Sequence, residues 1–368
     1  MKPVHLMHFA DLHLDHVLSE YGPAARRQRR AELLQCFDFI VDKALSSGVS
    51  ILLVAGDLLC ARSVSSSTLE AVKRGFARLG EAGVFVALVP GEAEEPDGLE
   101  ALREVASGNN VHLFMGDEWS RVEPIPGVSL WGLRTTGRNA SISVLAGLRV
   151  DGPGIHIGLM HATTEGQGPD GRGLSTVTGA DLAASGLHYL ALGHYHSVLN
   201  CSVGPSACWY PGSPAHHDFS TRGERHVLKV TLGDGPASVS RITVPARPHR
   251  VVVVDVSGKP ADYLRRRLAD LANLELCLRA VLEGELSAGL AWLPARLERE
   301  FAQSFFHLDI VDNTRPARPS LPGNGPEALL SKERGSGGDR QRDRALAIAL
   351  AALEEVGAVD HQKDGRVG

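Results

Sequence analysis

Ser50-Ile-Leu-Leu-Val-Ala-Gly-Asp-Leu-Leu59 is a short apolar run that ends in a glycine followed by an acid. A run of this length with polar flanks is typical of a strand that is buried on both faces. Open α/β sheets bind ligands beyond the carboxyl ends of their strands, which is where Asp57 lies. A Gly-Asp pair after a strand is more often only a turn. A functional role for Asp57 therefore depends on which residues follow the other predicted strands. We predict an α/β fold with a functional site around Asp57.

Potential metal ligands follow other predicted strands as well. They are Asp11 and His13 after the strand 4–10, His161 after a later strand, and His194 with His196 after another. A mixture of imidazoles and carboxylates suits Mn, Fe or Zn better than Mg or Ca, which prefer oxygen ligands. Two such ions about 4 Å apart would hold a phosphoester and generate hydroxide near neutral pH. A single histidine is more often a core or surface residue, but repeated strand-end placements favour a dinuclear metal site.

The overall composition excludes several classes of protein. The 368 residues are 43% hydrophobic, which predicts one large and one smaller domain. A net charge of −5 gives no overall basic field, so nucleic acid would need a local patch. The five cysteines show no C-x-x-C spacing, which argues against a disulfide framework and a zinc ribbon. No signal region and no apolar segment of about 18 residues is present, so we expect a cytoplasmic protein without a membrane partner.

The order of predicted elements changes along the chain. Strands and helices alternate up to residue 114, which predicts a largely parallel sheet. Strands dominate from 129 to 244, and this fits two packed sheets with helices outside. We expect a main domain at 1–247, a small α+β domain at 248–315, a flexible linker at 316–339, and a C-terminal helix and tail at 340–368.

The motifs resemble those of the calcineurin-like metallophosphoesterases in type and in order. Three segments narrow the resemblance to SbcD/YhaO-type bacterial DNA-repair exonucleases: Phe9–Asp15, Ala191–His196 and Tyr210–Pro214. The resemblance covers residues 1–245 and extends more weakly to 248–315, whose position and size match a capping domain. It implies a four-layer α/β/β/α sandwich with a small α+β cap.

The resemblance also implies a ligand set. By position, one ion would be held by Asp11, His13 and His196, a second by His161 and His194, with Asp57 between them. The third motif departs from the family pattern Gly-Asn-His-Asp/Glu, because this chain has Gly91-Glu92-Ala93-Glu94. Glu92 keeps an oxygen ligand but adds a negative charge where phosphate would bind. Ala93 cannot transfer a proton, and losing a general acid typically costs about 10²–10⁴ in rate. Cys60 replaces a more peripheral acid.

Other polar residues have less certain roles. His16, His216 or His217 could replace the missing acid, although an ordinary surface position is the more common explanation. Contacts to a DNA backbone are expected from a set of arginines, and the alternative is a solvated helix face. These are Arg26, Arg27, Arg29, Arg30, Arg222 and Arg225.

The resemblance implies a DNA-repair nuclease subunit with two divalent ions. Mn²⁺ is favoured, and Fe or Zn are alternatives. It also implies a coiled-coil, SbcC-like ATPase partner, while a homodimer is left open. Two other functions remain: a phosphoesterase for small molecules, or a metal-binding scaffold that binds DNA ends without efficient turnover because of Ala93.

Overall fold

The chain divides into two compact units, Met1–Arg247 and Pro248–Gly368. The computed structural model describes residues 2–60, 64–135, 144–165, 175–286, 290 and 293–316. The predicted linker at 316–339, apart from its first residue, and the predicted helix and tail at 340–368 lie outside these ranges. Among the helices of the described residues, none is both long and apolar enough to cross a membrane.

The first sheet of unit 1 has the strand order β14-β13-β1-β2-β3-β4. Its strands are β1 (Val4–Phe9), β2 (Ile51–Ala55), β3 (Phe85–Val89), β4 (Val111–Leu113), β13 (Arg225–Leu232) and β14 (Ser238–Val244). The first four strands are parallel, as the alternation of strands and helices predicts. The hairpin β13–β14 adds to this sheet through antiparallel pairing with β1. This long-range pairing carries no signal in the local sequence pattern.

The second sheet has the order β11-β12-β10-β7-β6-β5. Its strands are β5 (Ser120–Ile125), β6 (Val128–Leu133), β7 (Ile155–His161), β10 (Tyr189–Gly193), β11 (Leu199–Asn200) and β12 (Ala207–Tyr210). The four central strands are parallel, and β5 and β11 are antiparallel edges. A short parallel pair, β8 (Thr163–Thr164) and β9 (Thr176–Val177), follows the end of β7.

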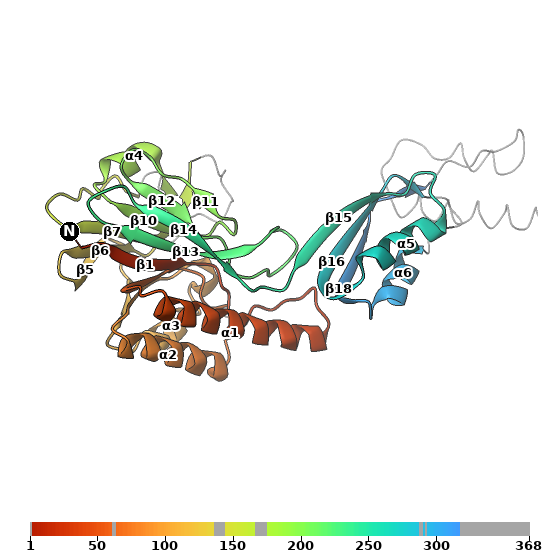
Figure 1. Cartoon of the computed structure of the whole chain (residues 1–368), viewed down its shortest axis with the longest axis horizontal. Helices are drawn as coiled ribbons and strands as arrows, with labels where there is room; N and C mark the ends of the chain where they lie inside the picture. The colour runs from red at the N-terminus through yellow and green to blue at the C-terminus, as the bar shows by residue number, and fades with distance from the viewer. Residues whose placement is uncertain are drawn as a thin grey trace, which may run out of the picture. The chain divides into compact units, whose positions relative to one another are not determined.

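Helices cover the outer faces of both sheets. They are α1 (Pro23–Ser46), α2 (Ser66–Glu81) and α3 (Leu99–Val105) on the first sheet, and α4 (Gly179–Ala184) on the second. Figure 1 shows the first three helices together on one side of the first sheet. The predicted four-layer α/β/β/α sandwich is confirmed.

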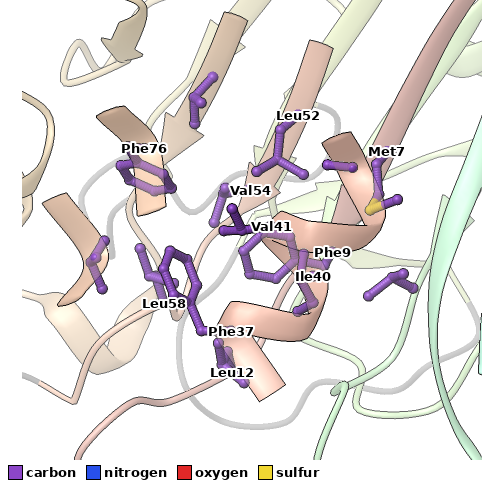
Figure 2. Packing of buried hydrophobic residues seen from close by; sticks show 14 of the residues in the cluster. Met7, Phe9, Leu12, Phe37, Ile40, Val41, Leu52, Val54, Leu58 and Phe76 are labelled. Carbon is purple, nitrogen blue, oxygen red and sulfur yellow. The ribbon is translucent and has the colours of Figure 1, made fainter. Parts of the chain in front are cut away.

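The strand β2 is buried on both faces, as its apolar run predicts. Leu52 and Val54 face the helices, where they join a cluster with Phe37 of α1 and Phe76 of α2 (Figure 2). The alternate residues Ile51, Leu53 and Ala55 pack between the two sheets. Burial of such side chains contributes about 1.5–3 kcal/mol each relative to full exposure. Packing on both faces therefore fixes the carboxyl end of β2, where Asp57 follows.

Unit 2 is a small sheet with two helices. Its elements are β15 (His249–Asp255), α5 (Ala261–Leu271), β16 (Asn273–Glu283), β17 (Glu285–Leu286), α6 (Leu293–Phe301), β18 (Phe305–Asp312) and β19 (Arg315–Pro316). The sheet β15-β16-β18 is parallel throughout, and β17 pairs with β19. The helices α5 and α6 form one apolar core with a single face of this sheet (Figure 1).

Candidate metal centre

Four of the predicted ligands lie in left-handed backbone at the carboxyl ends of strands. Their φ values are 56° for Asp11, 48° for His13, 53° for Asp57 and 108° for His194. Such a conformation costs about 1–3 kcal/mol for each non-glycine residue and is concentrated at functional sites. The extended backbone of β1 therefore does not continue through Asp11 and His13. The N–H groups of Asp11 and His13 donate to the carbonyls of Gly56 and Asp57, at 3.1 and 2.9 Å, and these bonds turn the loop.

One group of potential ligands comes from the loops after β1 and β10. Ligand atoms of Asp11, His13 and His196 lie within 4.8 Å of one another. The Nε2 atoms of the two histidines are 3.4 Å apart. Both oxygens of the Asp11 carboxylate accept from the backbone N–H of His194, at 3.0 and 3.2 Å. The two loops are thereby held at one edge of the sandwich.

A second group comes from β7, the third motif and the loop after β10. Its members are Glu92, His161 and His194. The Glu92 carboxylate oxygens lie 2.6 Å from Nε2 of His161 and 2.8 Å from Nδ1 of His194. The Nδ1 atom of His161 is 2.8 Å from the carbonyl of Ala55. A carbonyl only accepts, so Nδ1 carries the proton, and Nε2 is the atom that can coordinate a metal.

Asp57 lies between the two groups. Its Oδ2 atom is 3.5 Å from Nε2 of His13 and 3.7 Å from Nε2 of His161. Its Oδ1 atom accepts from the backbone N–H of Ala93 at 2.8 Å. Asp11, Asp57 and His161 form a third overlapping group of potential ligands. The structure thus brings all seven predicted ligands into one cluster, and metal coordination by each of them stays a prediction.

The electrostatics of the cluster fit divalent cations. Burial raises the pKa of Asp11 to about 7, and the charges of Asp57 and Glu92 add to the effect. Burial also raises the pKa of Asp57. Burial and the neighbouring His13 lower the pKa of His196 to about 4, so its imidazole is neutral and able to coordinate. Buried carboxylates this close together need a compensating positive charge, and the imidazoles beside them complete a donor set typical of Mn, Fe or Zn.

Two glycines allow the loops to approach closely. A Cβ atom on Gly91 would lie 2.1 Å from Oδ1 of Asp57, and one on Gly56 would lie 2.3 Å from Nδ1 of His161. Gly56 also has a φ of 87°. Any side chain at either position would displace a predicted ligand. Gly56 and Gly91 are therefore required by the packing of the site.

Glu94 is a buried residue that sequence analysis did not select. It lies in the short 3-10 helix η1 (Glu92–Glu94). Its carboxylate accepts backbone N–H groups from Asp57 at 3.0 Å, Leu59 at 2.9 Å and Gly91 at 2.7 Å. Burial, followed by the charge of Asp57, raises the pKa of Glu94 to about 8. Glu94 positions the loop that carries Asp57. The family pattern has an acid at this last position of the third motif, and this could have identified Glu94 from the sequence.

The Tyr210–Pro214 segment and the histidines after it support the other side of the site. Ser213 donates its hydroxyl to the carbonyl of Asp11 at 2.8 Å, and Nε2 of His217 lies 3.1 Å from the same oxygen. The expectation of surface positions is wrong for His216 and His217, because both are buried among loop carbonyls and hydroxyls. His16 is partly exposed, with its ring centre 6.1 Å from that of His13.

The predicted DNA-binding arginines fall into two sets. Arg29 and Arg225 are buried, and they donate to the carbonyls of His216 at 2.7 Å and His196 at 3.1 Å. A phosphate contact from these two is not favoured, since their guanidinium groups are used inside the fold. Side chains that remain on the surface or partly exposed are those of Arg26, Arg27, Arg30 and Arg222.

Comparisons with known proteins indicate which class of protein has this fold and this group of candidate ligands. No protein-family model matches the chain. The uncharacterized metallophosphoesterase YhaO of Bacillus subtilis is 28% identical over 324 residues, which cover 81% of this chain and 76% of that protein. The DNA double-strand break repair protein Mre11 of Aeropyrum pernix is 25% identical over 366 residues, covering 87% and 85%. These relatives support the metallophosphoesterase superfamily, and with it divalent metal ions as cofactors.

Solved structures of similar proteins include a dimetal phosphatase from Danio rerio. It has a TM-score of 0.42 at 11% identity and covers 66% of this chain and 98% of that one. A zinc complex of Vps29 from Entamoeba histolytica has a TM-score of 0.29 at 14% identity, covering 65% of this chain and 99% of that one.

Proposed function

We propose that this protein is a dinuclear-metal phosphodiesterase of the SbcD/YhaO type, acting as a DNA-repair exonuclease subunit. The observation that carries the proposal is the convergence of Asp11, His13, His161, His194 and His196 on the carboxylate of Asp57. The similarity to proteins named metallophosphoesterase and double-strand break repair protein supports hydrolysis of a DNA phosphodiester.

The residues of the cluster would have different roles in such a reaction. Divalent ions, when bound, supply Lewis-acid activation of the phosphoester and of a water molecule. Asp57 would contribute its carboxylate to both ions, because Oδ2 lies near both His13 and His161 while Oδ1 accepts from the Ala93 N–H. His161 would coordinate through Nε2, since Ala55 fixes its proton on Nδ1. Ala93 offers no side-chain proton to the leaving group, so turnover would be slow.

The cofactor, location and partners are further parts of the proposal. Mn²⁺ is the ion we favour, because the mixed imidazole and carboxylate set suits it. We place the protein in the cytoplasm, working on DNA with a coiled-coil ATPase of the SbcC type. Arg27 and Arg222 are exposed and are the best candidates for phosphate contacts.

A second candidate function is favoured by the third motif. Glu92 adds a negative charge and Ala93 removes an imidazole at the place where phosphate would bind. A chain of this kind would keep metal and fold, and would serve as a scaffold or a DNA-end binder. The two functions predict the same metal content but different turnover.

The deciding experiment compares wild type with Asp57→Asn and with the exposed control Asp42→Asn. Each protein is assayed with Mn²⁺ on linear duplex DNA and on a small aryl phosphodiester. We expect the wild type and Asp42→Asn to degrade DNA slowly and Asp57→Asn to be inactive. Turnover of the small ester alone, even with the ATPase present, would indicate a small-molecule phosphoesterase. Two bound metals with no turnover of either substrate would indicate the scaffold.

A further inference from the structure

Within the part of unit 2 that the structure describes, helices pack on one face of the sheet only. Val254 of β15 and Leu278, Ala280 and Leu282 of β16 share a core with α5 and α6. Successive side chains on a strand point to opposite faces, so the odd-numbered residues of β15 and β16 lie on the other side. Neither α5 nor α6 packs on this second face, which is called the open face below, and Cys277 near its amino end is fully buried.

A row of valines crosses the open face. Val253 of β15 pairs in register with Val281 of β16, which pairs with Val311 of β18. Val253 is 61% exposed, and the other two are partly exposed. In the next row, Arg279 pairs with Asp309, with Nε and Oδ2 2.5 Å apart. The centre of the open face is therefore apolar and carries an internally neutralised ion pair.

A parallel sheet with one open face is unusual. Parallel sheets occur almost only with both faces covered, and β15-β16-β18 is parallel throughout. The described helices of unit 2, α5 and α6, pack on the same face as each other. A further layer on the valine row would complete the arrangement that such sheets require.

The C-terminal segment has the sequence of a covering helix. Residues 340–356 are rich in Ala and Leu, and Leu346, Leu350 and Leu353 recur at i, i+4 and i+7. This spacing places the three leucines on one stripe of a helix. In unit 1 each outer face already has its helices, whereas this segment has no core of its own.

The length and charge of the segment fit the open face. A helix of 17 residues is about 25 Å long, and a seven-residue strand such as β15 is about 23 Å long. The described chain ends in β19, beyond the carboxyl end of β18, and the residues between 316 and 340 are ample to reach the sheet. Asp255 and Glu283 pair at the carboxyl end of the open face, and the segment begins with Arg340, Arg342 and Arg344. An antiparallel helix would bring these opposite charges together.

We infer that residues 340–356 form a helix that docks on the open face of β15-β16-β18, with the leucine stripe on Val253, Val281 and Val311. The cap would then be a three-layer unit with the C-terminal helix as its third layer. The occupant is a segment of the same chain, so docking is independent of protein concentration.

Amide hydrogen exchange of the full chain, followed by mass spectrometry, tests this inference. The variants are Leu350→Asp on the stripe, Val253→Asp on the sheet, and the control Ala351→Asp, which lies off the stripe. We expect the amides of 340–356 to be protected in wild type and in Ala351→Asp. Leu350→Asp and Val253→Asp should each speed their exchange at least tenfold. Unchanged protection of β16 shows that Val253→Asp leaves the sheet folded.

Three outcomes would overturn the inference. If the amides of 340–356 in wild type exchange at the rate of an unstructured chain, this segment does not dock, and another protein would have to cover the face. Protection that survives Val253→Asp would place the segment elsewhere. Protection that rises with protein concentration, together with a dimer in sedimentation, would assign the face to a second copy of the chain.

Discussion

The two sides of the candidate metal centre differ in how well their residues match the motifs of the proposed family. On one side, Asp11, His13 and His196 form a compact group supported by Ser213 and His217. On the other side, His161 and His194 face Glu92, and Ala93 stands where the proposed family would have an imidazole. Hydrogen bonds to backbone groups are present on both sides. The comparison teaches that a metal framework and a proton donor are separable, because the first depends on loop geometry and the second on one side chain.

Removal of the shared carboxylate should have the largest effect. Asp57→Ala takes away the group that lies between His13 and His161. We expect both ions to be lost together, with all phosphodiesterase activity, since each half of the site uses Asp57. Elemental analysis of the purified variant beside wild type measures this. Retention of one ion per chain would show that the two sides bind independently.

Ala93→His should give the next largest effect, as a gain. A supplied imidazole could protonate the leaving group, and general acid catalysis is worth about 10²–10⁴ in rate. We expect kcat on a phosphodiester to rise within this range while metal content stays unchanged. The control is Ala93→Leu, which changes size without adding a proton donor. An equal response of the two variants would mean that position 93 is not the place where a general acid is missing.

Glu94→Gln should weaken metal binding to a smaller degree. The amide NH₂ group cannot accept the backbone N–H groups that the carboxylate takes from Asp57, Leu59 and Gly91. Loss of such supporting groups typically costs about 10–100-fold in metal affinity. Titration of the metal-free protein with Mn²⁺ measures the change, and Glu95→Gln is the neighbouring control. An unchanged affinity would contradict the positioning role of Glu94.

Arg225→Ala should mainly affect stability on the His196 side. The buried guanidinium donates to the carbonyls of His196 and Arg222, both at 3.1 Å. Leaving these groups unpaired costs about 1–3 kcal/mol. Urea unfolding should show this loss, whereas the exposed control Arg222→Ala should change the free energy of unfolding by less than about 0.5 kcal/mol. A reversed order of the two variants would contradict the separation of buried and exposed arginines.

Much of this architecture follows from the sequence pattern. Contacts between distant parts of the chain could not be predicted in this way. The run before Asp57 indicated a buried strand because its length and flanks are local properties. The addition of β13 and β14 to the first sheet depends on pairing across more than 200 residues, for example Val4 with Leu232. The left-handed turns at Asp11 and His13 were missed, since they arise from bonds to another loop.

The supporting residues of the site were also harder to predict than the grouping of its candidate ligands. The ligands stand at strand ends and follow a familiar order of motifs. Glu94 and His217 contact backbone groups of loops that are distant in the sequence, at Asp57 and Asp11, so their supporting roles depend on contacts that only the fold supplies. Arg29 and Arg225 were expected on the surface, because a charged residue is seldom buried without partners that only the fold supplies.

Anomalous diffraction from crystals grown with Mn²⁺ tests the central claim most directly. We expect two peaks about 4 Å apart, one beside His13 and His196 and one beside His161 and His194, with the Asp57 carboxylate between them. No peak at Asp57, or peaks only at other acidic residues, would contradict the assignment of this cluster as a dinuclear metal centre.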